Sequence, residues 1–175
     1  MEIRRLRETD DRSVFRSGDV ELDRFFARYA GQNQFRHHVG VTYVAIEGQD
    51  IRGYATVAPG NVESEHLPAA ARRRAPRYPL PVLRLARLAA AESAQGTGVG
   101  SALLRHVLIL ALRMAGEYGC VGVLVDAKPG AVEFYERFGF STLEATEGRL
   151  ETRPSPTPMF LPLELIARAA AALHD

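Results

Sequence analysis

Residues 95–100 read Gln-Gly-Thr-Gly-Val-Gly, and this glycine run lies between an apolar, strand-length segment at 82–90 and a long amphipathic helix. The helix is predicted from apolar residues that recur at helical spacing: Val99, Leu103, Val107, Leu110 and Met114. Glycines at a strand-to-helix junction let backbone N–H groups turn toward one point, where the helix dipole adds positive potential. The junction therefore predicts a loop that binds a phosphate or pyrophosphate group.

Two familiar phosphate-binding loops fit this run poorly. A Walker A loop needs Lys followed by Ser or Thr after its last glycine, but Gly100 is followed by Ser-Ala and the chain's only lysine is Lys128. A dinucleotide-binding loop needs one more residue of spacing and a doubly wound domain around it. On the glycines alone, an ordinary strand-to-helix turn remains an alternative.

A second segment, residues 121–140, narrows these alternatives. It reads as a short apolar strand, a Pro-Gly helix start at 129–130, a short helix over 131–138 and a helix end at Gly139. Gln-Gly-x-Gly-x-Gly at the start of one helix, followed by Ala-x-x-Phe-Tyr-x-x-x-Gly-Phe at 131–140, closely resembles the Gcn5-related N-acetyltransferases (GNAT).

The resemblance covers about residues 1–165 and extends to one branch of this superfamily. That branch comprises the acetyltransferase toxins of type II toxin–antitoxin modules, which acetylate the amino group of aminoacyl-tRNA. Further segments that are similar to this branch lie at 15–26, 42–45, 53–55, 81–89, 125–127 and 159–162.

The predicted elements alternate between strands and helices. Strands are expected at 3–6, 41–46 and 51–57, and a helix after Ser17-Gly18-Asp19 is expected to bury Leu22, Phe25, Phe26 and Tyr29. A long connection over 59–80, with a helical piece near 67–74, leads to the glycine-loop crossover. The pattern predicts an α/β, GNAT-like sandwich with a mixed, largely antiparallel twisted sheet flanked by helices, in a single N-acetyltransferase domain over 1–175.

The chain is expected to end in a strand pair at 140–143 and 159–163, joined by a loop with Pro154, Pro156 and Pro158, and in a short helix. Homodimers are common in the resembled branch, so the resemblance implies a homodimer. Exposed apolar residues of the last strand pair would provide a surface for it.

Composition excludes several classes of protein. The single Cys120 excludes a disulfide framework and any cysteine-based zinc site, and favours a small buried side chain over a nucleophile. His37, His38 and His106 form no consistent ligand set, so no metal is expected. The N-terminus is too polar for a leader and the apolar runs are too short for a membrane span, which predicts a cytoplasmic protein with no membrane contact.

Arginine supplies 21 of the 22 basic residues, although the net charge is only +1. Together with the resemblance, the arginines that crowd one stretch predict RNA contacts: Arg72, Arg73, Arg74, Arg77, Arg84 and Arg87. A solvated loop in a lysine-poor chain is the alternative.

The resemblance implies acetyl-CoA as co-substrate. Its pyrophosphate would bind the glycine loop, and its pantetheine arm would pair with the main chain of the preceding strand. The residues implied are Leu88, Ala89, Ala90, Gln95, Gly96, Thr97, Gly98, Val99, Gly100, Ser101 and Phe134. Many relatives carry Arg where Gln95 stands, and the difference would remove one charge-assisted bond.

Tyr135 is the predicted catalytic residue, because a phenol near the thioester sulfur can protonate the departing thiolate. On spacing alone a packing aromatic would be favoured. No strong general base is evident, although Glu63, Glu65 and His66 lie in the long connection. An α-amine, with a reference pKa near 7.7–8.0, needs such a base less than a lysine near 10.4 does.

The leading hypothesis is a toxin that acetylates aminoacyl-tRNA and blocks translation. The resemblance implies a cognate antitoxin with a ribbon-helix-helix DNA-binding half as its partner. An N-acetyltransferase of a small amine or a protein N-terminus is the second hypothesis. A non-catalytic, CoA-binding regulatory module is the third.

Overall fold

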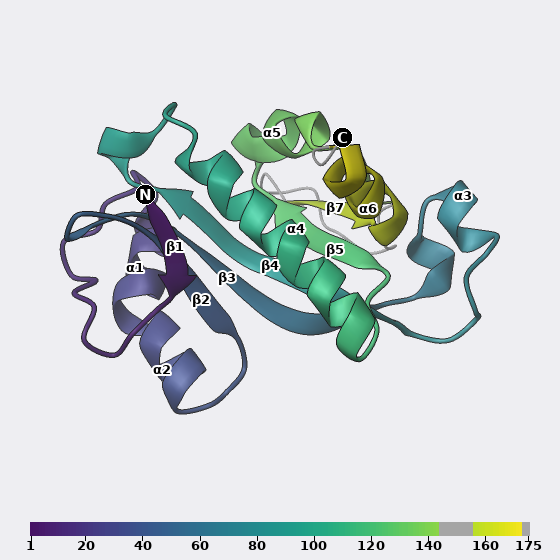
Figure 1. Cartoon of the computed structure of the whole chain (residues 1–175), viewed down its shortest axis with the longest axis horizontal. Helices are drawn as coiled ribbons and strands as arrows, with labels where there is room; N and C mark the ends of the chain where they lie inside the picture. The colour runs from purple at the N-terminus through teal and green to yellow at the C-terminus, as the bar shows by residue number, and fades with distance from the viewer. Residues whose placement is uncertain (144–155, 173–175) are drawn as a thin grey trace, which may run out of the picture. The chain divides into compact units, whose positions relative to one another are not determined.

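The computed structural model describes residues 1–143 and 156–172 (Figure 1). Its contacts group the chain into two compact units, the first made of 1–58 with 85–109 and the second of the described residues in 59–84 and 110–175. Strands β3 (Asp50–Val62) and β4 (Leu80–Ala90) and helix α4 (Val99–Glu117) contribute residues to both units. The single domain over 1–175 stays a prediction.

The first unit contains strands in the order β1-β2-β3-β4. β1 (Glu2–Arg5) is antiparallel to β2 (Val41–Glu47), and β2 is antiparallel to β3. The tight turn between β2 and β3 places Gly48 at a φ of +65°, where glycine has no Cβ to clash. A 3-10 turn, η2 (Glu92–Ala94), links β4 to the glycine loop.

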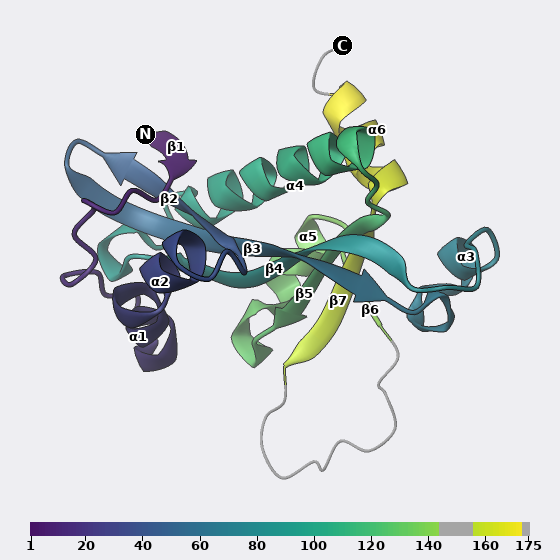
Figure 2. The same cartoon turned by 90° about the horizontal axis from the view of Figure 1, so that it is seen from below.

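Helices cover both faces of this four-stranded sheet. Gly53 and Tyr54 are neighbours on β3 and face opposite sides of the sheet, because successive strand residues point to opposite faces. A Cβ at Gly53 would lie 2.8 Å from Val99 Cγ1, so α4 packs closely on that face. On the other face Tyr54 stacks on Phe26, with ring centroids 4.3 Å apart, and donates its hydroxyl to the Leu22 carbonyl at 2.6 Å. Figure 2 shows α1 and α2 on the side of the sheet opposite α4.

Helix α1 (Val20–Arg28) begins where predicted, because the Asp19 carboxylate accepts hydrogen bonds from the first free N–H groups of the helix. Tyr29 was predicted on its buried face, and this prediction is wrong: Tyr29 is 44% exposed. The reason is a helix break. α1 ends at Arg28 and α2 (Ala30–Phe35) begins after Tyr29, so the periodicity that placed Tyr29 inward is interrupted.

The second unit contains the strand order β3-β4-β5-β7-β6. β5 (Gly122–Ala127) and β6 (Ser141–Thr142) are each antiparallel to β7 (Thr157–Pro162). The helical elements of this unit are η1 (Ser64–His66), α3 (Ala69–Arg72), η3 (Pro129–Ala131), α5 (Val132–Arg137) and α6 (Leu163–Ala172). The predicted class, an α/β fold with a mixed, largely antiparallel sheet flanked by helices, is confirmed.

Two expectations about this unit are corrected. β3 extends to Val62, which shortens the predicted 59–80 connection, and the helical piece near 67–74 is only the short α3. The apolar residues of the last strand do not form a free surface for a dimer, because Met159, Phe160 and Leu161 are buried. Pro154 lies outside the described residues.

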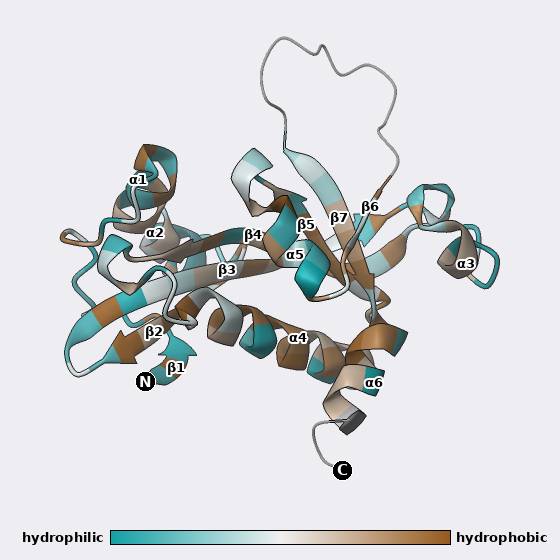
Figure 3. Cartoon of the chain, turned by 90° about the horizontal axis from the view of Figure 1, so that it is seen from above, coloured by the Kyte–Doolittle hydropathy of each residue, from teal (hydrophilic) through white to brown (hydrophobic). Residues whose placement is uncertain are grey.

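Helix α4 is apolar along most of its length (Figure 3), and it is long and apolar enough to cross a membrane by those two criteria alone. The expectation that every apolar run is too short is therefore wrong for this helix. Core helices of globular proteins meet the same two criteria. Leu103, Leu104 and Val107 of α4 are fully buried, as expected for a core helix.

A pair of buried hydroxyls joins β2 to β3. Thr42 and Thr56, 1% and 6% exposed, lie opposite each other in the register, and their Oγ1 atoms are 2.7 Å apart. One hydroxyl therefore donates a hydrogen bond to the other away from water.

Replacing one threonine by the similarly shaped valine leaves the other hydroxyl buried without its partner, which costs about 1–3 kcal/mol. We expect T42V and T56V each to lower the free energy of unfolding by that amount, whereas the double variant recovers most of the loss. Urea unfolding of the four proteins measures this. Additive losses in the double variant would contradict the prediction.

Candidate active site

The glycine loop has the backbone that its sequence predicts. Gly96 and Gly98 have φ values of +78° and +93°, which favour glycine, and a Cβ at either residue would meet nothing within 4 Å. The space beside the loop is therefore open. The Ala102 N–H bonds back to the Gly98 carbonyl at 3.0 Å, so the N–H groups at 99–101, in the first turn of α4, have no acceptor within the helix. This arrangement suits an anion.

Two side chains of the loop fix its shape. The Gln95 Nε2 donates to the carbonyls of Ser17, at 2.7 Å, and Ala90, at 3.3 Å. The Thr97 hydroxyl donates to the Ala94 carbonyl. Gln95 thus ties the loop to the segment before α1 and to the end of β4, which leaves its main chain, rather than its amide, as the part that can meet a ligand.

The end of β4 is the terminal strand within the first unit. β4 lies next to β3 in the sheet. The two strands approach closely, because a Cβ at Gly53 of β3 would lie 2.8 Å from the Ala89 carbonyl oxygen of β4. The N–H of Ala91 bonds to the Arg52 carbonyl at 2.8 Å. That the main chain of residues 88–90 also pairs with an extended ligand stays a prediction.

Arg87, on the same stretch of β4, is exposed and stacks on an aromatic ring. Its guanidinium carbon lies 4.8 Å from the ring centroid of Phe25 of α1. Sequence reasoning predicted Phe25 only as a core residue. The available signal was a second aromatic residue next to buried Phe26, but its pairing with Arg87 depends on the packing of α1 on β3.

Tyr135, in the second unit, is the more buried of the two adjacent aromatic residues of α5. It is 5% exposed and packs edge-on against Phe134 and Phe140, with centroids 5.1 and 5.4 Å apart. Burial raises the pKa of the Tyr135 phenol above its usual value. A phenol is protonated at neutral pH even at its reference pKa of about 10, so burial only makes loss of this proton harder. Gly139, with a φ of +97°, ends this turn as predicted.

The predicted arginine group is not one uniform surface. In the second unit Arg84 Nη2 forms an ion pair with Asp126 Oδ2 at 3.0 Å, whereas Arg87 belongs to the first unit. Arg72 and Arg77 line a polar hollow with Glu63, Ser64 and Glu65. Glu63 and Glu65, two of the candidate bases, therefore lie beside arginines of the long connection.

A larger hollow of about 710 Å³ lies between α3 and the start of α6 in the second unit. Leu67, Leu80 and Phe160 contribute apolar surface to it, and three arginines line it: Arg73, Arg74 and Arg168. Sequence reasoning did not single out Arg168, because nothing in its local pattern distinguishes it from a solvated helix residue.

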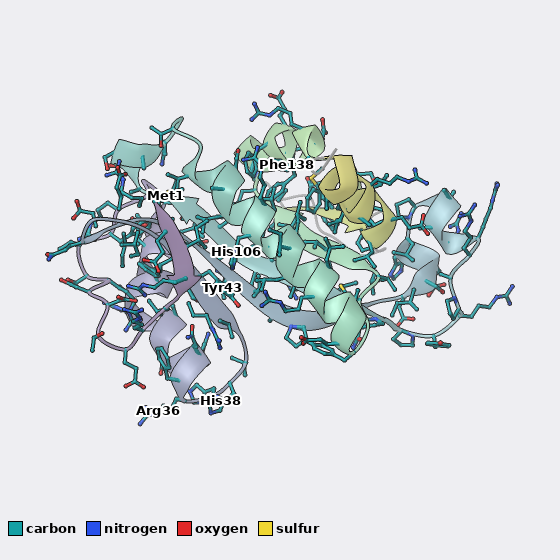
Figure 4. The ribbon with its side chains drawn as sticks, in the orientation of Figure 1. Met1, Arg36, His38, Tyr43, His106 and Phe138 are labelled. Carbon is teal, nitrogen blue, oxygen red and sulfur yellow. The ribbon has the colours of Figure 1, made fainter. Side chains whose placement is uncertain are left out.

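Cys120 is buried, as predicted, and its Sγ donates weakly to the Gly122 carbonyl at 3.3 Å. Burial raises the pKa of this thiol. Tyr43 of β2 and His106 of α4 contact each other, with ring centroids 4.6 Å apart (Figure 4). Within residues 1–143 and 156–172, no group of three or more His, Cys, Asp or Glu side chains could hold a metal ion.

Comparisons with known proteins agree with this geometry. Residues 38–142 match the acetyltransferase (GNAT) domain family. A tRNA-acetylating toxin of Mycobacterium tuberculosis (strain ATCC 25618 / H37Rv) is 33% identical over 138 residues, which cover 78% of this chain and 82% of the toxin.

Two solved structures share the fold. AtaT complexed with acetyl-methionyl-tRNAfMet superposes with a TM-score of 0.82 at 23% identity, over 97% of this chain and 98% of that one. A mutant AtaT toxin bound to the C-terminus of the antitoxin AtaR and acetyl-CoA gives a TM-score of 0.77 at 22% identity, over 97% of each chain. With its domain match and its toxin relative, the chain belongs to the GNAT acetyltransferase family, in the branch of the acetyltransferase toxins.

Proposed function

We propose that this N-acetyltransferase transfers the acetyl group of acetyl-CoA to the α-amino group of aminoacyl-tRNA and acts as a toxin that blocks translation. The observation that carries the proposal is the 33% identity, over most of both chains, with a tRNA-acetylating toxin. The open glycine loop at the start of α4 supports the choice of a phosphorylated co-substrate.

Acetyl-CoA would be held chiefly by main-chain atoms. The N–H groups of the glycine loop and of the first turn of α4 would bind its pyrophosphate. The main chain of β4 at Leu88, Ala89 and Ala90 would pair with its pantetheine arm, and Phe134 would contact it through its half-exposed ring. The residues assigned to the pyrophosphate are Gln95, Gly96, Thr97, Gly98, Val99, Gly100 and Ser101.

Tyr135 would be the general acid. The acetyl thioester supplies the activated acyl group. When the amine nitrogen bonds to the acetyl carbon and the carbon–sulfur bond breaks, the Tyr135 hydroxyl would give its proton to the departing sulfur. At its reference pKa of about 10 a phenol is protonated at pH 7, so the Tyr135 hydroxyl has a proton to give.

An α-amine acceptor removes the need for a strong base. An α-amino group has a reference pKa near 7.7–8.0, against 10.4 for lysine, so much more of it is neutral at pH 7. Glu63, Glu65 and His66 remain candidates to take its proton.

The partners we propose are aminoacyl-tRNA and a cognate ribbon-helix-helix antitoxin. Arginines fit phosphate oxygens through their forked N–H donors. Those assigned to the RNA are Arg72, Arg73, Arg74, Arg77, Arg84 and Arg87. We further propose a cytoplasmic homodimer that uses no metal ion.

The direct test is transfer of radiolabelled acetyl from acetyl-CoA to total aminoacylated tRNA, with deacylated tRNA as control. We expect label only on the charged pool, and sequencing of the labelled species would name the amino acid. Label on a small amine or a protein N-terminus, but on no tRNA, would replace this acceptor. Binding of acetyl-CoA without transfer to any amine would indicate a regulatory module.

The glycine conformations provide a second prediction. G98A forces a Cβ into the left-handed region and disturbs the N–H groups at the start of α4, so we expect acetyl-CoA affinity to fall about 10-fold or more. G48A is the matched control, because Gly48 also has a positive φ and open space around it but lies in the β2–β3 turn. Calorimetric titration with acetyl-CoA measures both. Equal losses in the two variants would mean that G98A acts only through stability.

The third prediction concerns Tyr135. Y135F removes the hydroxyl and keeps the ring that packs on Phe134 and Phe140, so we expect kcat to fall by about 100-fold or more while acetyl-CoA binding and the melting temperature stay close to wild type. Steady-state acetylation assays with titration calorimetry measure this. A variant with full kcat would show that Tyr135 is only a packing residue.

A further inference from the structure

Arg87 is held in place by an aromatic ring rather than by an acid. Its guanidinium stacks on the Phe25 ring at 4.8 Å, and its Nη1 donates to the Ala86 carbonyl at 2.8 Å. Across residues 1–143 and 156–172, no carboxylate forms an ion pair with it. Arg84, three residues earlier on the same strand, instead pairs with Asp126 at 3.0 Å. The charge of Arg87 is therefore available to a ligand.

The Phe25 ring is itself held by packing contacts. Its ring stacks beside Tyr54, with centroids 6.4 Å apart, and the next residue, Phe26, stacks on the same tyrosine at 4.3 Å. The Tyr54 hydroxyl is bonded to the Leu22 carbonyl, one turn earlier in α1. A guanidinium stacked on such a ring loses little further freedom when it binds, and its outer N–H groups stay open.

The surroundings of the stack favour an anion. Residues 24–46 contain no acidic residue, and the arginines of α1 and the end of α2 are exposed. The acids of this region, Asp19, Glu21 and Asp23, all lie at or before the first turn of α1, where Asp19 caps the helix and Asp23 Oδ1 accepts from the Ser17 N–H and hydroxyl. The charged residues of the second half of α1, Arg24 and Arg28, are therefore both positive.

The Arg87–Phe25 stack also lies next to the part of β4 that we propose binds the pantetheine arm. Arg87 directly precedes Leu88, Ala89 and Ala90, and strand geometry puts the Cα of Arg87 about 10 Å from that of Ala90. In an aminoacyl-tRNA the phosphate nearest to the reacting amine is the one that joins the terminal nucleotide to its neighbour. Its two free oxygens match the forked donors of an arginine.

We infer that Phe25 is a positioning residue that presents Arg87 to the backbone phosphate at the 3′ end of the acceptor RNA. The inference rests on the proposed function and deepens it, because it names the part of the substrate that this edge binds. It gives Arg87 a different role from the arginines of the 63–77 connection, because Arg87 would contact the acceptor RNA close to the reacting amine.

The test compares two acceptors that share the reacting amine. One is aminoacyl-tRNA, and the other is the methyl ester of the same amino acid, which has no phosphate. For R87Q we expect KM for aminoacyl-tRNA to rise about 10-fold, as for loss of a charged hydrogen bond, and for F25L roughly 2- to 5-fold, as for loss of an exposed cation–π contact. The kcat, the KM for acetyl-CoA and the rate with the methyl ester should stay unchanged.

Salt dependence and conservative rescue complete the test. R87Q should reduce the slope of log affinity for tRNA against log salt by about 1, the effect of one lost phosphate contact. F25L should reduce it in the same direction, and F25Y, which keeps a ring under the guanidinium, should restore the wild-type values. R5Q is the charge-matched control, because Arg5 is also exposed on a strand of the first unit.

Each other outcome overturns a defined claim. Equal losses with the methyl ester would show that Phe25 and Arg87 act on folding or on the acyl donor, and an unchanged salt slope in R87Q would exclude the phosphate contact. Wild-type protein that acetylates the methyl ester but no charged tRNA would overturn the proposed function, and the contact with it. Wild-type activity on both acceptors, with unaffected variants, would overturn the contact alone.

Discussion

The close approach of α4 to β3 and β4 is the contact on which the candidate site depends. It requires a residue without a side chain at position 53, because a Cβ there would lie 2.8 Å from both the Ala89 carbonyl oxygen and Val99 Cγ1. Val99 is also the first residue of α4. The same contact therefore brings the start of the helix, with its free N–H groups, against the end of β4. Tyr54 anchors α1 on the opposite face of the strand.

The loop itself shows how a site can be built from backbone. Gly96 and Gly98 adopt conformations that other residues disfavour, and the polar side chains of Gln95 and Thr97 bind carbonyl groups of the protein. What remains for an anion are N–H groups with fixed directions. A loop of this kind recognises the charge and shape of a pyrophosphate through its backbone, so substitutions of its side chains change its stability more than its chemistry.

The positive charge that an exposed arginine offers to a ligand depends on the group that the arginine contacts. Arg84 and Arg87 are alike in sequence and both exposed, yet one is paired with a carboxylate and the other is stacked on a ring. An exposed ion pair contributes little to stability but reduces the positive potential that a nucleic acid meets. A stacked arginine keeps its full charge and a defined direction. An arginine-rich stretch therefore contains residues with unequal capacity to bind RNA.

The sequence by itself determined the fold class, the order of its elements, the glycine loop and the family, because these follow from local periodicity, backbone preference and two motifs. It also indicated the end of α5 at Gly139 and the burial of Cys120. It did not determine that α1 breaks before Tyr29, that β3 continues to Val62, or that the last strand is buried, since each depends on contacts between distant segments. Only the tertiary structure decided that Tyr135 is buried against Phe134 and Phe140. It alone paired Phe25 with Arg87, because that contact forms only when α1 packs across β3 beside β4.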